Sequence, residues 1–190
     1  MAPVHKAAQL NAVQGLIRLL DDEPDLVHAW HDLPWSLGKG QPLHFASFSA
    51  SVQATQLLLD RGAVITARAG EGSWTPLVVA CVFSSAATVP LLLARGADPT
   101  MVGRNGMTVL MLLARERLTD RYSIFSRVAA IRLLLEDGRV PVDAKDSQGR
   151  TALWYACKAG QVDVARVLLL EGRADHTIAD NEGRRPADLK

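Results

Sequence analysis

The residues from Gln148 to Asp180 form a unit that recurs along almost the whole chain. The unit reads QGRTALWYACKAGQVDVARVLLLEGRADHTIAD, with two apolar helical runs, a break of small residues between them and a glycine-containing turn afterwards. Repetition with a period of about 20–50 residues is typical of stacked structural repeats. This feature restricts the chain to an array in which each unit buries its apolar face on its neighbours.

Six positions begin the first helix of such a unit. Thr75, Thr108 and Thr151 each precede an apolar run, and a threonine side chain there can accept a hydrogen bond from a free amide of the first helical turn. Proline often follows, at a position where its missing amide is not needed. The starts lie at Ala2, Gln41, Thr75, Thr108, Thr151 and Arg185, which are 39, 34, 33, 43 and 34 residues apart.

The second helix of a unit is indicated by a run of leucines that ends near a glycine. The runs are Leu57–Leu59, Leu91–Leu93, Leu133–Leu135 and Leu168–Leu170. The glycines that we expect to close these helices in a left-handed conformation are Gly62, Gly96, Gly138 and Gly172. The pattern predicts antiparallel helix pairs joined by short segments rich in turn residues.

These residues resemble the ankyrin repeat. The strongest matches are GADPTMVGRNGMT (Gly96–Thr108) and GRTALWYACKAGQVDVARVLLLEG (Gly149–Gly172). The resemblance implies an all-α ankyrin solenoid of stacked helix pairs, with hairpin-like finger loops and a concave face made of fingers and first helices. It covers nearly the whole chain, so we expect a single domain over residues 1–190. The expected repeats are 2–40, 41–74, 75–107, 108–150, 151–184 and a partial one at 185–190.

The chain departs from the family's pattern at the histidine of each first helix. The family's histidine is present as His5 and His44, which we expect to hydrogen-bond the start of their helices. Val78, Met111 and Trp154 replace it in the other units. This exchange predicts apolar packing at those positions, with Trp154 in the core.

Three further departures concern the second helices and the loops. Pro90 predicts a helix that starts late, with Thr88 as a cap, or a helix that is kinked. The segment Trp30–Gly40 is longer than a normal finger, and the segment Arg115–Val128 holds about nine residues more than the family's pattern needs. The latter is either a solvated extension of two helices or a second contact patch, built on Tyr122, Ile124 and Phe125.

Composition argues against several functional classes. A net charge of +1 gives no general attraction to nucleic acid or anionic membranes. The N-terminus lacks an apolar signal segment and no apolar run approaches a spanning length, so we expect a cytoplasmic protein, or a nuclear one. The chain contains no G-x-S-x-G and no phosphate-binding glycine loop, so we expect no enzymatic activity and no cofactor.

Cysteines and histidines give no convincing metal site or disulfide. Cys81 and Cys157 occupy the same position two units apart, at ~20 Å by helix stacking, whereas a disulfide needs Cα atoms within about 7 Å. We expect both to be buried. His28 and His31 have a helical spacing that could hold a metal beside Asp32, but no third ligand lies at a suitable spacing.

The concave surface is the predicted partner-binding site. Aromatic and arginine side chains dominate binding hot spots, because they remove large areas from water or form forked hydrogen bonds. The expected apolar anchors are Trp35, Phe48, Trp74 and Phe83. The alternatives are that Trp35, with Trp30, only fills the long first connection and that Phe48 and Phe83 belong to the core. The expected orienting charges are Arg104, Arg150 and Lys158, with Asn105, Met107 and Lys145 beside them at the finger tips.

The sequence therefore predicts a monomeric, non-enzymatic module that binds a protein or peptide, apolar toward one end of the groove and acidic toward the other. One alternative is a regulatory or targeting ankyrin domain of a larger enzyme or channel. A small-ligand or nucleic-acid binder that uses Trp74 is disfavoured by the net charge of +1.

Overall fold

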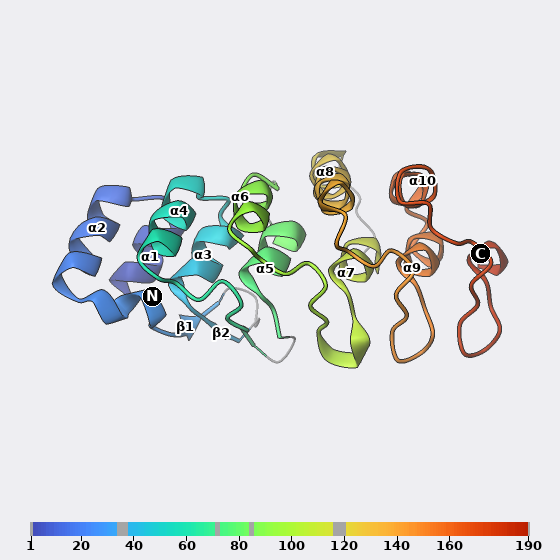
Figure 1. The fold of residues 1–190 in the computed structure, drawn as a ribbon, viewed down its shortest axis with the longest axis horizontal. Coiled ribbons are helices and arrows are strands. Elements are labelled where there is room, and N and C mark those ends of the chain that lie inside the picture. The colour runs from blue at the N-terminus through green and yellow to red at the C-terminus, as the bar shows by residue number, and fades with distance from the viewer. Residues whose placement is uncertain (1, 34–37, 71–72, 84–85, 116–120, 190) are drawn as a thin grey trace. The chain divides into compact units, whose positions relative to one another are not determined.

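The structure is a computed structural model that describes residues 2–33, 38–70, 73–83, 86–115 and 121–189, with the backbone alone described for 121–125. The chain divides into two compact units, Met1–Asp98 and Pro99–Lys190 (Figure 1). Each unit consists of stacked helix pairs, and strands are few and short. The predicted all-α solenoid class is confirmed.

The first unit is built from stacked helix pairs. The described pairs are α1 (Pro3–Gln9) with α2 (Val13–Asp22), α3 (Pro42–Phe48) with α4 (Val52–Asp60), and α5 (Pro76–Phe83) with α6 (Val89–Ala94). Helices α1, α3 and α5 pack against one another in that order, and α2 packs on α4. Fully buried apolar side chains such as Leu16, Phe45 and Leu58 fill the space between the layers.

The finger loops of the first unit begin with a short hairpin. A 3-10 turn, η1 (Pro24–His28), leads to β1 (His31–Asp32), which pairs in antiparallel fashion with β2 (Lys39–Gly40). In the next finger an antiparallel bridge joins Ala69 and Trp74.

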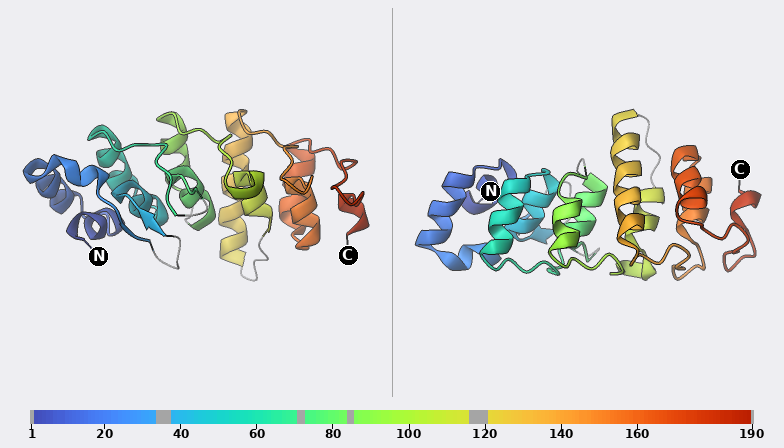
Figure 2. Two further views of the ribbon diagram at one scale, coloured as in Figure 1. Left: turned by 90° about the horizontal axis from the view of Figure 1, so that it is seen from below. Right: turned by 45° about the horizontal axis from the view of Figure 1, so that its top comes forward.

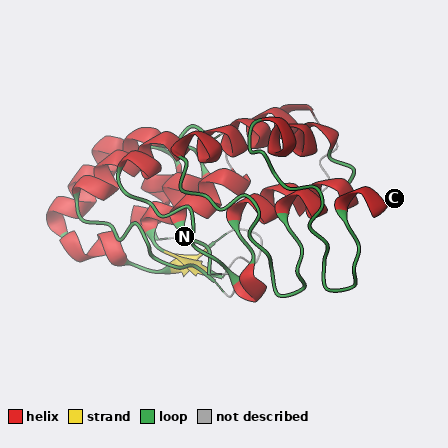
Figure 3. Ribbon diagram, turned by 45° about the vertical axis from the view of Figure 1, so that its right-hand side comes forward, coloured by secondary structure: helices red, strands yellow, loops and turns green. Residues whose placement is uncertain are grey.

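The second unit repeats the same plan. Its elements are η3 (Arg104–Gly106), α7 (Val109–Arg115), α8 (Arg121–Asp137), α9 (Ala152–Lys158), α10 (Val162–Leu170) and η4 (Pro186–Asp188). Helix α7 packs on α9, α8 packs on α10, and η4 packs on α9. The fingers appear as green loops on one side of these helices in Figure 3. They join through backbone hydrogen bonds of 2.9 Å, from Ser147 to Asn105 and from Asn181 to Gln148.

The predicted caps of the first helices are confirmed. The hydroxyl groups of Thr75, Thr108 and Thr151 accept bonds from amides three residues later, at 3.3, 3.3 and 3.2 Å. His44 also bonds as expected, because its Nδ1 accepts from the amide of Gln41 at 3.1 Å. Nε2 of His5 donates to the carbonyl group of Ala29 at 3.0 Å, which ties the first helix to the loop that follows α2.

Two expected helix ends are wrong. Gly62, Gly96 and Gly138 do have positive φ, but in the last repeat Arg173 (φ 53°) takes this conformation in place of Gly172. Helix α6 starts late, as Pro90 predicts, yet the Thr88 side chain makes no capping bond.

The reason for the different end of α10 is one extra residue in its last turn. Within the leucine runs of α4, α6, α8 and α10, the fully buried residues are Leu58, Leu92, Leu134 and Leu168. The first leucine of the last run therefore corresponds to the middle leucine of the other runs. The amide of Ala174 donates to the carbonyl group of Leu168, six residues earlier. The corresponding amide of the second repeat, that of Ala63, donates to the carbonyl group of Leu58, which is only five residues earlier.

The inserted segment of the fourth repeat lengthens α8, which spans 17 residues (Figure 2). The side chains of Tyr122, Ile124 and Phe125 lie outside the described residues, so the contact patch stays a prediction. Near its base, Arg127 is buried, and its Nη1 donates a 2.8 Å bond to the carbonyl group of Leu113. This bond ties α8 to the end of α7.

Candidate partner-binding surfaces

Three of the four predicted aromatic anchors form one cluster in the first unit. The ring centroids of Phe48 and Phe83 are 5.7 Å apart, and those of Trp74 and Phe83 are also 5.7 Å apart. Interacting aromatic side chains have ring centroids roughly 4.5–7 Å apart. All three side chains are half-buried, so each packs on its neighbours and keeps part of its surface available to a partner. We call these three residues the aromatic cluster.

The backbone places this cluster where first helices meet a finger. Phe48 and Phe83 are the last residues of α3 and α5, which pack side by side. Trp74 ends the finger before α5, and its carbonyl group accepts a 3.1 Å bond from Nε2 of His44. The same nitrogen lies 3.1 Å from the carbonyl group of Ala67. A buried histidine therefore fixes both sides of the finger that carries Trp74.

The fourth anchor, Trp35, lies outside the described residues and stays a prediction. Its neighbour in the same connection, Trp30, is 50% exposed, with its ring centroid 6.4 Å from that of His44. Trp30 thus adds an exposed aromatic surface to the fingers of the first unit.

Basic side chains mark the corresponding surface of the second unit. Arg115 and Lys158 are the last residues of α7 and α9, which pack together, and both side chains are exposed. Each stands at the repeat position that Phe48 holds in the first unit. We call Arg115 and Lys158 the basic pair. Two like charges on neighbouring helices favour an acidic group between them.

Arg150, one of the expected orienting charges, forms an internal ion pair, and its role in partner binding stays a prediction. Its guanidinium group forms bonds of 2.9 and 2.7 Å with Oδ2 of Asp146, whose side chain is fully buried. Its Cζ also lies 4.8 Å from the ring centroid of Tyr155 and 5.4 Å from that of Trp154. Arg150 is therefore committed to an internal ion pair and to ring stacking, because the buried carboxylate needs a compensating charge.

The electrostatics of Asp146 reflect this arrangement. Burial acts to raise its pKa, but hydrogen bonds from Arg150, Tyr155 and backbone amides outweigh burial, so the pKa lies below its ordinary value. The pKa of Tyr155 rises to about 12, chiefly through burial and then through its bond to Asp146. The carboxylate of Asp146 and the guanidinium group of Arg150 therefore both stay charged at neutral pH.

The same arrangement occurs in the next finger, and the sequence analysis missed it. Asp180 and Arg184 repeat the pairing at 2.8 Å, and the Cζ of Arg184 lies 5.6 Å from the ring centroid of Trp154. The signal was the spacing D-x-x-G-R, which appears at 146–150 and at 180–184. Trp154 is buried, as predicted, beneath both arginines.

The remaining predicted residues of the finger tips fall into two groups. Arg104, Asn105 and Lys145 are exposed, and Asn105 has a φ of 60° in the turn η3. Met107 is only 9% exposed, so its expected position at the tip is wrong. It occupies the repeat position of Trp74 and Arg150, directly before the threonine cap.

The cysteines differ from each other. Cys81 is buried, as predicted, and burial raises its pKa to about 12. Cys157 is only half-buried, which contradicts the expectation for this position. Its side chain lines an apolar groove beside the turn η4.

The described residues hold no group of three or more histidine, cysteine or acidic side chains arranged for a metal. His31 instead faces His5 and Phe45, with ring centroids 5.3 and 6.4 Å away. In the part of the chain that the structure describes, no helix is both long and apolar enough to cross a membrane.

Comparison with known proteins agrees with the repeat geometry. Residues 4–103 and residues 96–180 each match a family model that is described as three copies of the ankyrin repeat. The chain therefore belongs to the ankyrin-repeat family. Ankyrin repeats are protein-interaction modules.

Similar proteins differ widely in size. The chain is 28% identical over 162 residues to the palmitoyltransferase AKR1 of Lachancea kluyveri, covering 85% of this chain and 20% of that protein. It is 33% identical over 141 residues to the ankyrin repeat and KH domain-containing protein mask-1 of Caenorhabditis elegans, covering 73% of this chain and 5% of that protein. It is 25% identical over 219 aligned residues to the probable 26S proteasome regulatory subunit p28 of Saccharomyces cerevisiae, covering 98% of this chain and 92% of that protein. The chain thus spans a fifth or less of the first two relatives.

Proposed function

We propose that this chain is a non-catalytic binding module, acting in the cytoplasm or nucleus, that holds a partner protein through the aromatic cluster of its first unit. The observation that carries this proposal is the contact of Phe48, Trp74 and Phe83 on one surface, with each ring half-buried. A polar or charged surface would give little desolvation energy, whereas clustered aromatic side chains are the usual centres of binding hot spots.

Rigid helices support this role. The cluster sits on the ends of α3 and α5 and on a finger held by His44, so its side chains need little ordering when a partner binds. Less ordering leaves more of the contact energy for affinity. The partner segment that suits this surface carries a large apolar side chain as its anchor.

The basic pair of the second unit provides a separate contact for an acidic segment. Arg115 and Lys158 are exposed, while Arg150 and Arg184 are already paired with buried aspartates. Exposed charges act mainly on the rate of association and on specificity. We therefore assign affinity to the aromatic cluster and selection of acidic partners to the basic pair.

Affinity capture of cellular partners tests the proposal. The wild-type chain is compared with a Phe48→Ala, Trp74→Ala, Phe83→Ala variant and with a control, Val52→Ala, Val64→Ala, whose side chains are exposed on the same unit outside the aromatic cluster. Circular dichroism confirms that each protein is folded. Loss of partners from the first variant alone supports the proposal, and equal capture by all three proteins overturns it.

A second candidate function is regulation or targeting within a larger protein. It is favoured by the palmitoyltransferase AKR1, of which the matching region makes up only 20%. An antibody against residues 146–184, applied to cell extracts, decides between the two. A band much larger than the 20.5 kDa of this chain supports the larger protein.

A further inference from the structure

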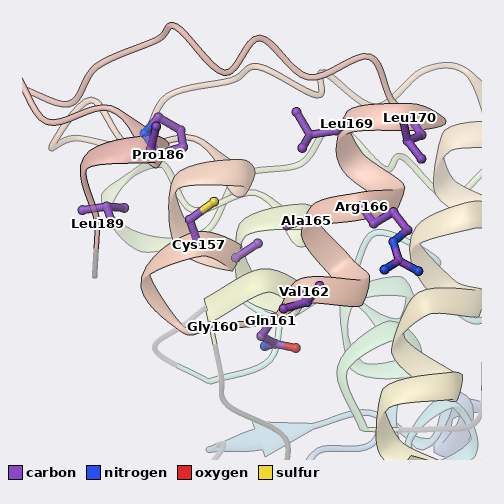
Figure 4. Close-up of a pocket in the computed structure, with 12 residues that line it drawn as sticks. Cys157, Gly160, Gln161, Val162, Ala165, Arg166, Leu169, Leu170, Pro186 and Leu189 are labelled. Atoms are coloured by element: carbon purple, nitrogen blue, oxygen red, sulfur yellow. The ribbon is translucent and has the colours of Figure 1, made fainter.

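An apolar groove of about 500 Å³ lies between α10, the end of α9 and the turn η4 (Figure 4). Cys157, Ala165, Leu169 and Leu189 are among the side chains that line it. Arg166 is the one charged residue among its described lining residues. The groove belongs entirely to the second unit and is separate from the basic pair.

Leu170 makes this groove different from the other second helices. It stands two residues after the buried Leu168 and is 74% exposed. The residues two places after Leu20, Leu58, Leu92 and Leu134, the last buried leucines of the other second helices, are also exposed, but they are small or acidic: Asp22, Asp60, Ala94 and Glu136. The position is therefore solvent-facing in every repeat, and only here among the described helices does it carry a large apolar side chain. Val162 and Leu169, which line the same groove, are also exposed, at 66% and 39%, and a contiguous exposed apolar patch is typical of interaction sites.

The groove also continues an interface that the chain already uses. The residue three places before the buried leucine is fully buried in α4 and α8, as Thr55 and Ile131, but Ala165 is only half-buried in α10. Helix α10 itself lies against one second helix, α8, and one first helix, α9. A helix in the groove would lie in the same way against α10 and η4.

We propose that this groove binds an amphipathic helix of a partner protein. Its apolar residues, spaced at i, i+3, i+4 and i+7, contact Ala165, Leu169 and Leu170, as the apolar face of α10 contacts α8. A carboxylate beside the apolar face meets Arg166. This site adds a second partner surface to the one proposed for the aromatic cluster and does not depend on it.

A stapled helical peptide tests the proposal. The probe is the chain's own segment 160–172 with Arg166→Glu, since α10 is a helix that already packs in this geometry, and its helicity is verified by circular dichroism. A second peptide retains the arginine. Binding is measured by fluorescence anisotropy and by protection of Cys157 from N-ethylmaleimide, with Cys81 as an internal thiol that is buried.

We expect saturable binding, protection of Cys157, and weaker binding of the arginine peptide. Leu170→Asp and Val162→Asp should each weaken binding roughly tenfold or more, because an exposed apolar contact is lost. Leu10→Asp, an equally exposed leucine in the first unit, should change nothing. Absence of binding by both helical peptides, or binding that ignores Leu170→Asp, overturns the proposal. Dimerisation in sedimentation that Leu170→Asp abolishes also overturns it, because the occupant is then a second copy of the chain.

Discussion

The hydroxyl group of Tyr155 donates a 2.7 Å hydrogen bond to Oδ2 of Asp146, a carboxylate whose side chain has no exposed surface. The other carboxylate oxygen accepts bonds of 2.9 Å from the amides of Gln148 and Arg150. One aspartate thus closes the finger loop and attaches it to α9. The same aspartate binds the guanidinium group of Arg150, which holds this side chain against the finger.

Replacing Tyr155 with Phe should destabilise the protein. The substitution removes a hydrogen bond to a buried charge, which typically costs about 1.5–3 kcal/mol. Urea unfolding at neutral pH measures the change in the free energy of unfolding. A suitable control is Thr177→Val, which removes a 2.6 Å bond to Asp175 on the surface and should leave the midpoint unchanged. Equal effects of the two substitutions would show that burial of Asp146 is not what makes the bond matter.

Local chemistry explains why so much of the fold was predictable. The caps by Thr75, Thr108 and Thr151 depend on residues within one helical turn, so the sequence alone identifies them. The buried leucines follow from the apolar period of each second helix. The placement of Phe48 and Phe83 at neighbouring helix ends follows from the same repeat register.

Contacts between repeats were harder to predict. Arg150 was expected to be a free charge because its finger position is exposed in the register, but a buried carboxylate four residues earlier captures it. Whether a cation faces solvent or an internal partner depends on side-chain packing, which periodicity does not encode. The extra residue in the last turn of α10 was not predicted for a related reason. The sequence does not show whether the first or the middle leucine of a run of three is the buried one, and only the structure identifies it as Leu168 in α10.

Acidification below neutral pH should destabilise the protein through His44. Burial lowers the pKa of this imidazole to about 4, and its bonds to backbone groups only partly oppose burial. The unfolded chain, with a pKa of about 6.5, binds the proton first. The contribution of neutral His44 is therefore fully present above pH ~6.5 and is lost as the pH falls toward ~4, by about 3 kcal/mol in all.

The measurement is the free energy of unfolding between pH 7 and pH 4 for the wild type, His44→Gln and His176→Gln. We expect the first variant to be less stable at neutral pH and to have a flatter curve, because it has lost the titrating group. His176 is exposed, so the His176→Gln variant should show the same dependence of the free energy of unfolding on pH as the wild type. Parallel curves for the wild type and His44→Gln would contradict the assignment.

Close packing of the fingers predicts different costs for two glycine substitutions. Gly149 and Gly138 have nearly the same φ, 76° and 77°. An added Cβ at Gly149 would lie 2.9 Å from the backbone nitrogen of Asn181, whereas at Gly138 it would meet open space. Gly138→Ala should cost about 1–2 kcal/mol for the left-handed conformation. Gly149→Ala should cost roughly 1–3 kcal/mol more, because the neighbouring finger must move. Thermal unfolding of both variants measures the difference, and equal costs would show that the fingers are not tightly packed.

The two thiol groups should react at different rates. Cys81 is buried and its pKa is raised to about 12, so almost no thiolate forms at neutral pH. Cys157 is half-buried, and burial raises its pKa as well. In native protein we expect an aromatic disulfide reagent to modify Cys157 slowly and Cys81 only after unfolding. Mass spectrometry of the labelled protein identifies the site, and modification of Cys81 in the native state would contradict its place in the core.

Charge reversal should separate the two basic residues that the sequence analysis grouped together. Arg150→Glu places a second carboxylate beside the buried Asp146, so it should lower the free energy of unfolding strongly; removing one partner of a buried ion pair typically costs about 3–5 kcal/mol. Lys158→Glu changes an exposed side chain at the end of α9, so stability should be unaffected.

Binding should respond in the opposite order. Lys158→Glu should reduce the capture of acidic partners and make the remaining capture less sensitive to salt, because the screened attraction is gone. Urea unfolding and capture at low and high salt are measured on both variants, with Arg18→Glu in α2 as an exposed control outside the basic pair. If Lys158→Glu leaves capture unchanged at low salt, the basic pair does not select partners. If Arg150→Glu leaves the unfolding midpoint unchanged, the ion pair with Asp146 does not hold the finger in solution.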